Sequence, residues 1–277
     1  MANCKKKKFS IKVFKTMNTN NNILFTSKLS IGYTSKSNSN CVAENLNLNL
    51  KQGKLITLIG GNGIGKSTLL RTLTGIQKPL SGTVYLNEKD IQTFKSQDLA
   101  QNLSLVLTEK LPPSNLTVFE LIALGRQPYT NWIGKLSEED YLKINEAMQL
   151  TKVAHLKDKK HYEISDGQLQ KVLIARALAQ DTSMIVLDEP TTHLDLLHKV
   201  SVFKLLKKLA VETNKCILFS THDIDLAIQL SDEMIVMTSD FVIQDEPCNL
   251  ILNGIFQTLF KDENIVFDGL KGKFVIS

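Results

Sequence analysis

The sequence predicts an α/β fold in which a mostly parallel sheet is covered by helices on both faces. Short, fully apolar runs typical of buried strands alternate along the chain with amphipathic helical stretches. One of these runs, residues 55–59, leads through a glycine-rich loop directly into a helical segment. A chain of 277 residues, 43% of them hydrophobic, is long and apolar enough to bury the core of such a domain.

Positive charge is concentrated at the N-terminus. Residues 1–43 hold eight lysines and no acidic residue, so the remaining chain has a net charge of −3 although the whole chain has +5. The body of the protein therefore lacks the basic excess expected for nucleic-acid binding. We expect residues 1–22 to form a flexible, solvated leader, and a weak attraction to anionic lipid is the alternative.

Cysteine usage and hydropathy suggest a chain that stays inside the cell. The four cysteines are scattered, without a C-x-x-C pair or a histidine spacing suited to a metal, as in proteins of the reducing cytoplasm. No apolar run approaches the length of a bilayer span, and the basic residues 1–10 precede no signal-type apolar region. We therefore expect a soluble, unexported chain that reaches a membrane only through a partner.

The first strands are expected at residues 23–33 and 42–50. In the second of them Leu46, Leu48 and Leu50 alternate with asparagines, which makes one face apolar. The strand at residues 55–59 follows. Beyond the glycine-rich loop and its helix, a short strand is expected at residues 83–86.

A helical insertion is expected at residues 109–163. Thr117 and Ser137 each precede acidic residues in the way that helix caps do, and the two helices extend to about Leu124 and Leu150. Strands and helices alternate again after the insertion. Helices are expected from the cap Ser165 to about residue 179, at 196–213 and at 224–230. Buried strands are expected at 184–187, 216–219 and 234–237, and we expect the strand at 234–237 to be the last one of the core. A short helix near 255–260 and terminal strands complete the chain.

The glycine-rich loop carries the strongest chemical signal. Its spacing, G-x-x-x-x-G-K-[ST], places backbone N–H groups and a helix start against phosphate oxygens, with a lysine to reach the β- and γ-phosphates and a serine to hold Mg²⁺. A glycine-rich turn that only joins a strand to a helix is the disfavoured alternative. The sequence therefore predicts a nucleoside triphosphate site formed by Gly60, Gly61, Asn62, Gly63, Ile64, Gly65, Lys66, Ser67 and Thr68.

Three further side chains are expected at the carboxyl ends of buried strands, where open α/β sheets bind ligands. Asp188 follows the strand at 184–187 and suits a Mg²⁺ ligand, and Glu189 beside it suits a base that orients water. His222 follows the strand at 216–219 and faces the same crevice, although a lone histidine is more often structural.

Residues 165–168 are interpreted as a second anion site. Ser165 supplies a hydroxyl, Gly167 permits close approach, and both stand at a helix N-terminus. An ordinary capped helix has much the same sequence, so this signal is weak when taken alone.

Together these residues resemble the ATP-binding-cassette (ABC) family over residues 24–240. Residues 60–68 resemble its Walker A motif, 164–168 its signature, 185–189 its Walker B motif with the catalytic glutamate, and 192–195 its D-loop. The resemblance implies a P-loop NTPase (RecA-like) core with an antiparallel β subdomain and the inserted helical subdomain at 109–163. The ATPase domain would span residues 23–240, followed by an extension at 241–277.

The resemblance also implies roles for individual residues. ATP and Mg²⁺ would bind between two head-to-tail copies, with Ser67, Asp188 and Thr108 near the metal. Glu189 would orient water, while His222 and Lys66 would stabilise charge on the leaving phosphoryl group. The remaining nucleotide contacts implied are Tyr33, stacked on adenine, and Ser165, Gly167, Gln168 and Asp195.

Two positions depart from the family pattern. Asp166 replaces the first glycine of the signature, so its carboxylate must point away from the triphosphate or be paired. Thr108 and Glu109 stand where the family has a Mg²⁺-sensing glutamine. These departures affect the coupling between ATP and a transporter.

Residues 116–129 resemble a segment of the ATPases of iron-siderophore, haem and cobalamin importers. This likeness implies an ATP-hydrolysing homodimer on the cytoplasmic face of the inner (plasma) membrane, bound to integral-membrane permease subunits and, through them, to a substrate-binding protein. Tyr129 and Trp132 would line the docking surface or, equally, fill the core of the helical lobe.

Two alternatives remain. The first is a non-transport ABC ATPase of cofactor assembly or nucleic-acid maintenance. The net charge of −3 after residue 43 argues against DNA binding, and the 99 residues from Lys66 to Ser165 leave no room for the long coiled-coil insertion of chromosome-type relatives. A non-hydrolysing nucleotide switch is supported only by the two departures.

Overall fold

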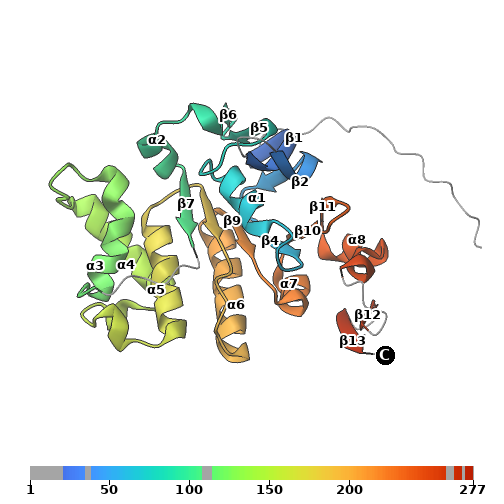
Figure 1. The fold of residues 1–277 in the computed structure, drawn as a ribbon. Helices are drawn as coiled ribbons and strands as arrows, with labels where there is room; N and C mark the ends of the chain where they lie inside the picture. Colours follow the sequence, from blue (N-terminus) through green and yellow to red (C-terminus); the bar gives the residue numbers. More distant parts are fainter. Residues whose placement is uncertain (1–20, 35–38, 108–113, 260–264, 270–271, 277) are drawn as a thin grey trace, which may run out of the picture.

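The computed structural model describes residues 21–34, 39–107, 114–259, 265–269 and 272–276. Most of the predicted leader lies outside the described residues, as do Thr108 and Glu109. Figure 1 shows an α/β core flanked by a helical subdomain on one side and by the C-terminal elements on the other, with antiparallel strands above the core.

The core is a six-stranded sheet in the order β11-β10-β4-β9-β8-β7. All neighbouring strands are parallel except β10 and β11, which are antiparallel. The expectation that the strand at 234–237 ends the core sheet is wrong, because the short, half-buried β11 adds one more edge strand. The six strands are β4 (Leu55–Gly60), β7 (Leu103–Val106), β8 (Met184–Leu187), β9 (Cys216–Ser220), β10 (Glu233–Met237) and β11 (Val242–Asp245).

Strand β4 shows why the apolar runs are continuous. Its residues Leu55 and Ile59 pack on one side with α5 (Asp166–Ala179) and α6 (Leu196–Glu212). Ile56 and Leu58 pack on the other side with α1 (Lys66–Leu73) and the antiparallel sheet. Both faces of the strand are covered, so neither face can be polar.

The antiparallel sheet lies against α1 and contains five strands. The predicted strand at 42–50 is split in two at residues 47–48, shortly after Asn45, which has a left-handed φ of 56°, and both halves pair with β1. Leu46, Leu48 and Leu50 are nevertheless all buried, as the alternation predicts. The five strands are β1 (Asn22–Thr34), β2 (Ser39–Leu46), β3 (Asn49–Lys51), β5 (Ser81–Leu86) and β6 (Lys89–Asp90), followed by η2 (Ile91–Thr93) and α2 (Ser96–Ala100).

The helical insertion begins its helices where the sequence predicts. Thr117 and Ser137 both form capping boxes, with Glu120 and Asp140 respectively. Such reciprocal bonds satisfy backbone N–H groups that a helix start leaves unpaired. The described elements are α3 (Val118–Ala123), η3 (Leu124–Tyr129), α4 (Glu138–Leu150), η4 (Ala154–Leu156) and η5 (His161–Glu163), and α3 and α4 pack on α5.

Buried Arg126 joins η3 and α4 of this subdomain to α5. Its Nε bonds Asp140 Oδ1 at 2.7 Å, its Nη1 donates to the Ala179 carbonyl at 2.9 Å, and its guanidinium lies 3.9 Å from the Tyr129 ring centre. Gly125 is required beside it, because a Cβ there would lie 2.2 Å from the Arg176 carbonyl oxygen. The segment 124–129 is thereby fixed to the backbone of α5.

The C-terminal elements follow α7 (Ile224–Leu230) and pack on the core through aromatic side chains. Phe256 stacks on Phe267 with ring centres 4.8 Å apart. The helix expected near 255–260 is the 3-10 turn η6 (Ile255–Thr258), and the terminal strands are β12 (Ile265–Asp268) and β13 (Lys273–Ile276). Helix α8 (Pro247–Leu252) was not expected from the sequence. None of the helices in the described ranges is both long and apolar enough to cross a membrane.

Candidate functional site

The glycine-rich loop joins the end of β4 to the start of α1. Gly65 has a left-handed φ of 111°, and a Cβ at this position would lie 2.2 Å from Val42 Cγ1 of β2. Only glycine fits both conditions. The loop is therefore shaped by the core and by the antiparallel sheet together.

The Lys66 side chain folds back onto the start of the loop. Its side chain is buried, and its Nζ donates to the carbonyl oxygens of Gly60 and Gly61, at 3.1 Å each. Burial lowers the pKa of Lys66 from its usual value, while the charges of Glu189 and Asp188 act to raise it. The ammonium group thus sits within the field of both predicted carboxylates.

Tyr33, at the end of β1, reaches the same helix start. Its hydroxyl lies 2.5 Å from Thr68 Oγ1, and half of its surface is exposed. Tyr33 therefore lies at the edge of the loop, and its residue surface remains half exposed to solvent. Its stacking on adenine stays a prediction.

Asp188 and Glu189 follow β8, and Ser220 at the end of β9 holds both of them. The Ser220 hydroxyl donates to Asp188 Oδ1 at 2.6 Å and accepts the N–H of Glu189 at 2.9 Å. Ser220 was not singled out from the sequence. Its only signal is that it is a polar residue ending a buried strand beside the predicted His222.

The predicted base and the predicted histidine contact each other. His222 Nε2 donates to Glu189 Oε1 at 2.8 Å, and Thr192 Oγ1 donates to Glu189 Oε2 at 3.2 Å. Glu189 also has a left-handed φ of 47°, a conformation that costs a non-glycine residue free energy and is common at functional sites. Both carboxylate oxygens of Glu189 are therefore oriented by neighbours.

The predicted second anion site at residues 165–168 and the D-loop residue Asp195 each form a helix start. Ser165 and Gln168 make the capping box of α5, and the Asp195 carboxylate caps α6 by accepting the N–H of His198 at 2.8 Å. Within the described part of the chain, no hydrogen bond joins these residues to the loop at 60–68. Asp166 is exposed at the first position of α5, where its charge suits the positive end of the helix dipole.

The donor set suits a magnesium ion that is held mainly by phosphates and water. The described residues contain no cluster of three acidic, histidine or cysteine side chains able to hold a metal alone. Ser67 and Asp188 provide the one hydroxyl and one carboxylate oxygen that Mg²⁺ uses beside nucleotide phosphates. The two side chains fit the ion, and the third predicted ligand, Thr108, lies outside the described residues.

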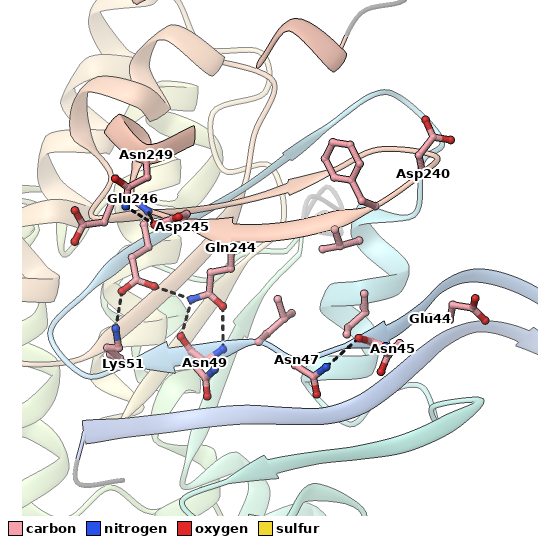
Figure 2. Close-up of a pocket in the computed structure, with 15 residues that line it drawn as sticks. Glu44, Asn45, Asn47, Asn49, Lys51, Asp240, Gln244, Asp245, Glu246 and Asn249 are labelled. Atoms are coloured by element: carbon pink, nitrogen blue, oxygen red, sulfur yellow. Dashed lines mark hydrogen bonds and ion pairs between the residues drawn. The ribbon is translucent and has the colours of Figure 1, made fainter. Parts of the chain in front are cut away.

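A second hollow, of about 700 Å³, lies between β3, β11 and α8 and contains none of these residues. Figure 2 shows its polar side chains bonded to one another. Gln244 bonds the backbone N–H and carbonyl of Asn49 at 2.9 and 2.6 Å and Glu233 at 2.7 Å, and Glu233 pairs with Lys51 at 3.2 Å. This network joins the two sheets and is structural.

Comparison with known proteins agrees with this geometry. Residues 43–192 match the ABC transporter family. An uncharacterized ABC transporter ATP-binding protein of Methanocaldococcus jannaschii is 41% identical over 253 residues, covering 91% of this chain and 86% of the relative. The iron(3+)-hydroxamate import ATP-binding protein of Bacillus subtilis is 39% identical over 224 residues, covering 81% and 82%. The ferric enterobactin transport ATP-binding protein of Escherichia coli is 33% identical over 228 residues, covering 82% and 84%.

Solved structures give the same result. A metal-chelate type ABC transporter in an inward-facing conformation superposes with a TM-score of 0.75 at 27% identity, covering 92% of this chain and 96% of that one. A dimeric bacterial ABC transporter cassette superposes with a TM-score of 0.68 at 27% identity, covering 81% and 98%. The predicted fold class is thus confirmed, and the chain belongs to the ABC transporter family.

Proposed function

We propose that the chain is the ATP-hydrolysing subunit of an importer of iron chelates. One observation carries the hydrolytic part of the proposal: Lys66, Asp188, Glu189 and His222 come together at the carboxyl ends of β4, β8 and β9. The cargo class rests on relatives that are named for hydroxamate, enterobactin, achromobactin and petrobactin transport. These names favour a siderophore over haem or cobalamin.

In this proposal residues 60–68 bind the triphosphate through backbone N–H groups and the α1 N-terminus. Lys66 would exchange its two carbonyl partners for phosphate oxygens, and Tyr33 would lie on the base. Mg²⁺, when bound through Ser67 and Asp188, would neutralise charge on the β- and γ-phosphates.

Glu189 would accept a hydrogen bond from the attacking water and orient it toward the terminal phosphate. His222 Nε2 already donates to Glu189 Oε1, so it can hold this carboxylate in position, and it would redirect this N–H to stabilise the transferred phosphoryl group. Ser220 fixes the backbone of Glu189 and the side chain of Asp188 at once.

We further propose that the active form is a homodimer. Ser165, Gly167, Gln168 and Asp195 would act on the nucleotide of the second copy, because their hydrogen bonds stay at their own helix starts. Beside them, Leu196 and Leu197 are 66% and 81% exposed, which provides apolar surface for a second chain.

The permease would dock on a hollow of about 600 Å³ between α2 and the residues after η3. Trp132 and Ile133 line it and are 93% and 69% exposed, so Trp132 does not fill the core of the helical lobe. Tyr129 instead packs on Arg126. The chain would thus bind peripherally at the cytoplasmic face of the membrane and contact a substrate-binding protein only through the permease.

The domain boundaries are also proposals. We assign residues 23–240 to the ATPase domain, 109–163 to its helical subdomain and 241–277 to an extension whose first strand, β11, joins the core sheet. Residues 1–22 would be a separate leader.

Two measurements test the function. ATP turnover of the purified chain should fall at least about 100-fold in Glu189→Gln, within the range found when a group acting directly in catalysis is removed. Equal turnover in both proteins would refute the assignment of Glu189. The tagged chain should also co-purify from membranes with a polytopic protein whose addition raises its ATP turnover. If no such protein stimulates turnover, the importer assignment fails and a soluble ABC ATPase is favoured.

A further inference from the structure

The start of α6 touches the start of α5 through the side chain of His198. His198 lies in the first turn of α6, and its ring packs on Gly167 in the first turn of α5. A Cβ built on Gly167 would lie 2.4 Å from Cδ2 and 3.1 Å from Nε2 of this ring. The ring thus occupies the space that any larger residue at position 167 would need.

The same ring is held from its other edge by Asp195. His198 Nδ1 donates to Asp195 Oδ1 at 2.8 Å, and the backbone N–H of His198 donates to the same oxygen at 2.8 Å. These bonds, the backbone one first, hold the pKa of Asp195 below its usual range. Any residue other than proline at position 198 could supply the backbone bond of a helix cap. The Nδ1 bond and the contact with Gly167 require the imidazole.

We propose that His198 is a positioning residue that sets the signature residues Ser165 and Gly167 in register with the loop bearing Asp195. This inference rests on the proposed homodimer, in which both segments face the nucleotide of the second copy. Such groups must be held to within about 0.5 Å to act together. An imidazole suits this task because it is rigid and has only two side-chain torsions.

The contact also favours glycine at position 167, because a larger residue there would have to displace the His198 ring. The sequence explains Gly167 by close approach to a phosphate, a reason that lies in the other copy. The structure adds a reason within the same chain, since a methyl group at position 167 would collide with the His198 ring.

The pairing test uses Glu189→Gln as the parent, because loss of hydrolysis preserves the ATP-bound pair. Analytical ultracentrifugation with ATP and Mg²⁺ measures the dimer dissociation constant, and binding of a fluorescent ADP analogue to the single chain measures the loop at 60–68. His198→Ala should weaken pairing about tenfold, a typical effect for a residue that orients functional groups, and leave ADP binding within about twofold. His198→Phe keeps a ring on Gly167 and should recover part of the pairing. His155→Ala, an exposed histidine on η4, is the matched control and should pair like the parent.

Pairing of His198→Ala equal to that of the parent would overturn the role of His198 and leave the proposed function intact. If the parent itself fails to pair with ATP, the proposed function is overturned and this inference with it.

A stability measurement that does not depend on ATP tests the packing itself. Gly167→Ala should lower the thermal unfolding midpoint in the wild type but much less in a His198→Ala background, because removing the ring makes room for the methyl group. If the two substitutions shift the unfolding midpoint additively, the packing of the His198 ring on Gly167 is overturned.

Discussion

Ser220 illustrates how much of the site depends on a residue that never meets the nucleotide in our proposal. Its one hydroxyl satisfies the N–H of Glu189 and orients Asp188 at the same time. Removing this hydroxyl should disturb the positions of both Asp188 and Glu189, and it should therefore lower activity although the side chain is small.

We therefore predict that Ser220→Ala lowers ATP turnover by about 10- to 100-fold, as the loss of such orienting contacts typically does. It should also cost about 1–3 kcal/mol of unfolding free energy, because the N–H of Glu189 loses its partner. Steady-state ATPase assays and urea denaturation measure the two effects. Ser183→Ala removes a hydroxyl bonded to the Asn102 carbonyl at 3.1 Å, away from the site, and should leave turnover unchanged. Full turnover in Ser220→Ala would contradict the role assigned to this hydroxyl.

Most of the candidate site could be predicted from the sequence because its residues follow buried strands directly. Lys66, Asp188 and His222 are set by motif spacing and by the common edge at which parallel strands end. Ser220, Thr192 and His198 could not be predicted, since each acts by touching a residue that is remote in sequence or through a geometry that no spacing encodes. The left-handed φ of Glu189 likewise has no sequence signal, because glutamate rarely adopts it.

At the scale of elements, the buried ion pair between Arg126 and Asp140 holds the helical subdomain to α5. Burial acts to raise the pKa of Asp140, but hydrogen bonds from the Ser137 N–H, from Arg126 and from the Ser137 hydroxyl outweigh it, so this pKa lies below its usual value. A carboxyl with a depressed pKa stabilises the fold above its unfolded-state pKa, about 3.9, and this stabilisation is lost as pH falls through the folded-state pKa.

We predict that Asp140→Asn costs about 3 kcal/mol or more at pH 7, because it leaves the Arg126 charge buried without a counter-ion. The difference from wild type should begin to shrink below about pH 4, where the Asp140 carboxyl of the unfolded chain becomes protonated, and it should continue to shrink until the pH falls below the depressed folded-state pKa. Urea denaturation from pH 7 to pH 3 measures it, with Asp98→Asn on exposed α2 as the control. A difference that stays constant across this range would show that the charge of Asp140 is not its source.

The elements that the sequence predicted correctly are those with a strong local signal. Caps at Thr117, Ser137 and Ser165 mark three helix starts, and continuous apolar runs mark β4, β8, β9 and β10. Several short elements, among them α2, β7, β11 and α8, escaped prediction because their stability comes from neighbours rather than from their own pattern. The break at residues 47–48 escaped prediction because the leucines on either side of it continue to alternate and are all buried.

At the scale of the whole molecule, the exposed pair Trp132 and Ile133 should determine partner binding. Aromatic side chains exposed in a hollow are common anchors of protein interfaces. We predict that Trp132→Ser with Ile133→Ser reduces co-purification of the permease at least about tenfold, because two desolvated anchors are lost. Quantitative mass spectrometry of the tagged complex measures this.

The matched control is Leu252→Ser on α8, an apolar residue that is 83% exposed on the opposite side of the core. Neither change should alter ADP binding to the single chain. Equal loss of the permease in both proteins, or in neither, would place the docking surface elsewhere.

Hydrogen bonds tie helix α5 to neighbouring elements at its C-terminal end, whereas its N-terminal end contacts the half-exposed His198 ring. At its C-terminal end Gln180 donates to the carbonyls of Ala100 and Leu103, and Arg126 donates to that of Ala179. Its other end carries Ser165 and, by 14 residues of helical rise, lies about 21 Å away. The hydrogen-bonded C-terminal end can therefore act as the pivot of a tilt, and the displacement grows along the helix toward Ser165. A tilt of about 6° would displace Ser165 by about 2 Å over that length, which is enough to make or break a hydrogen bond to a phosphate. A small rotation of the helical subdomain would thus be amplified at the signature without any change in the length or fold of the helix.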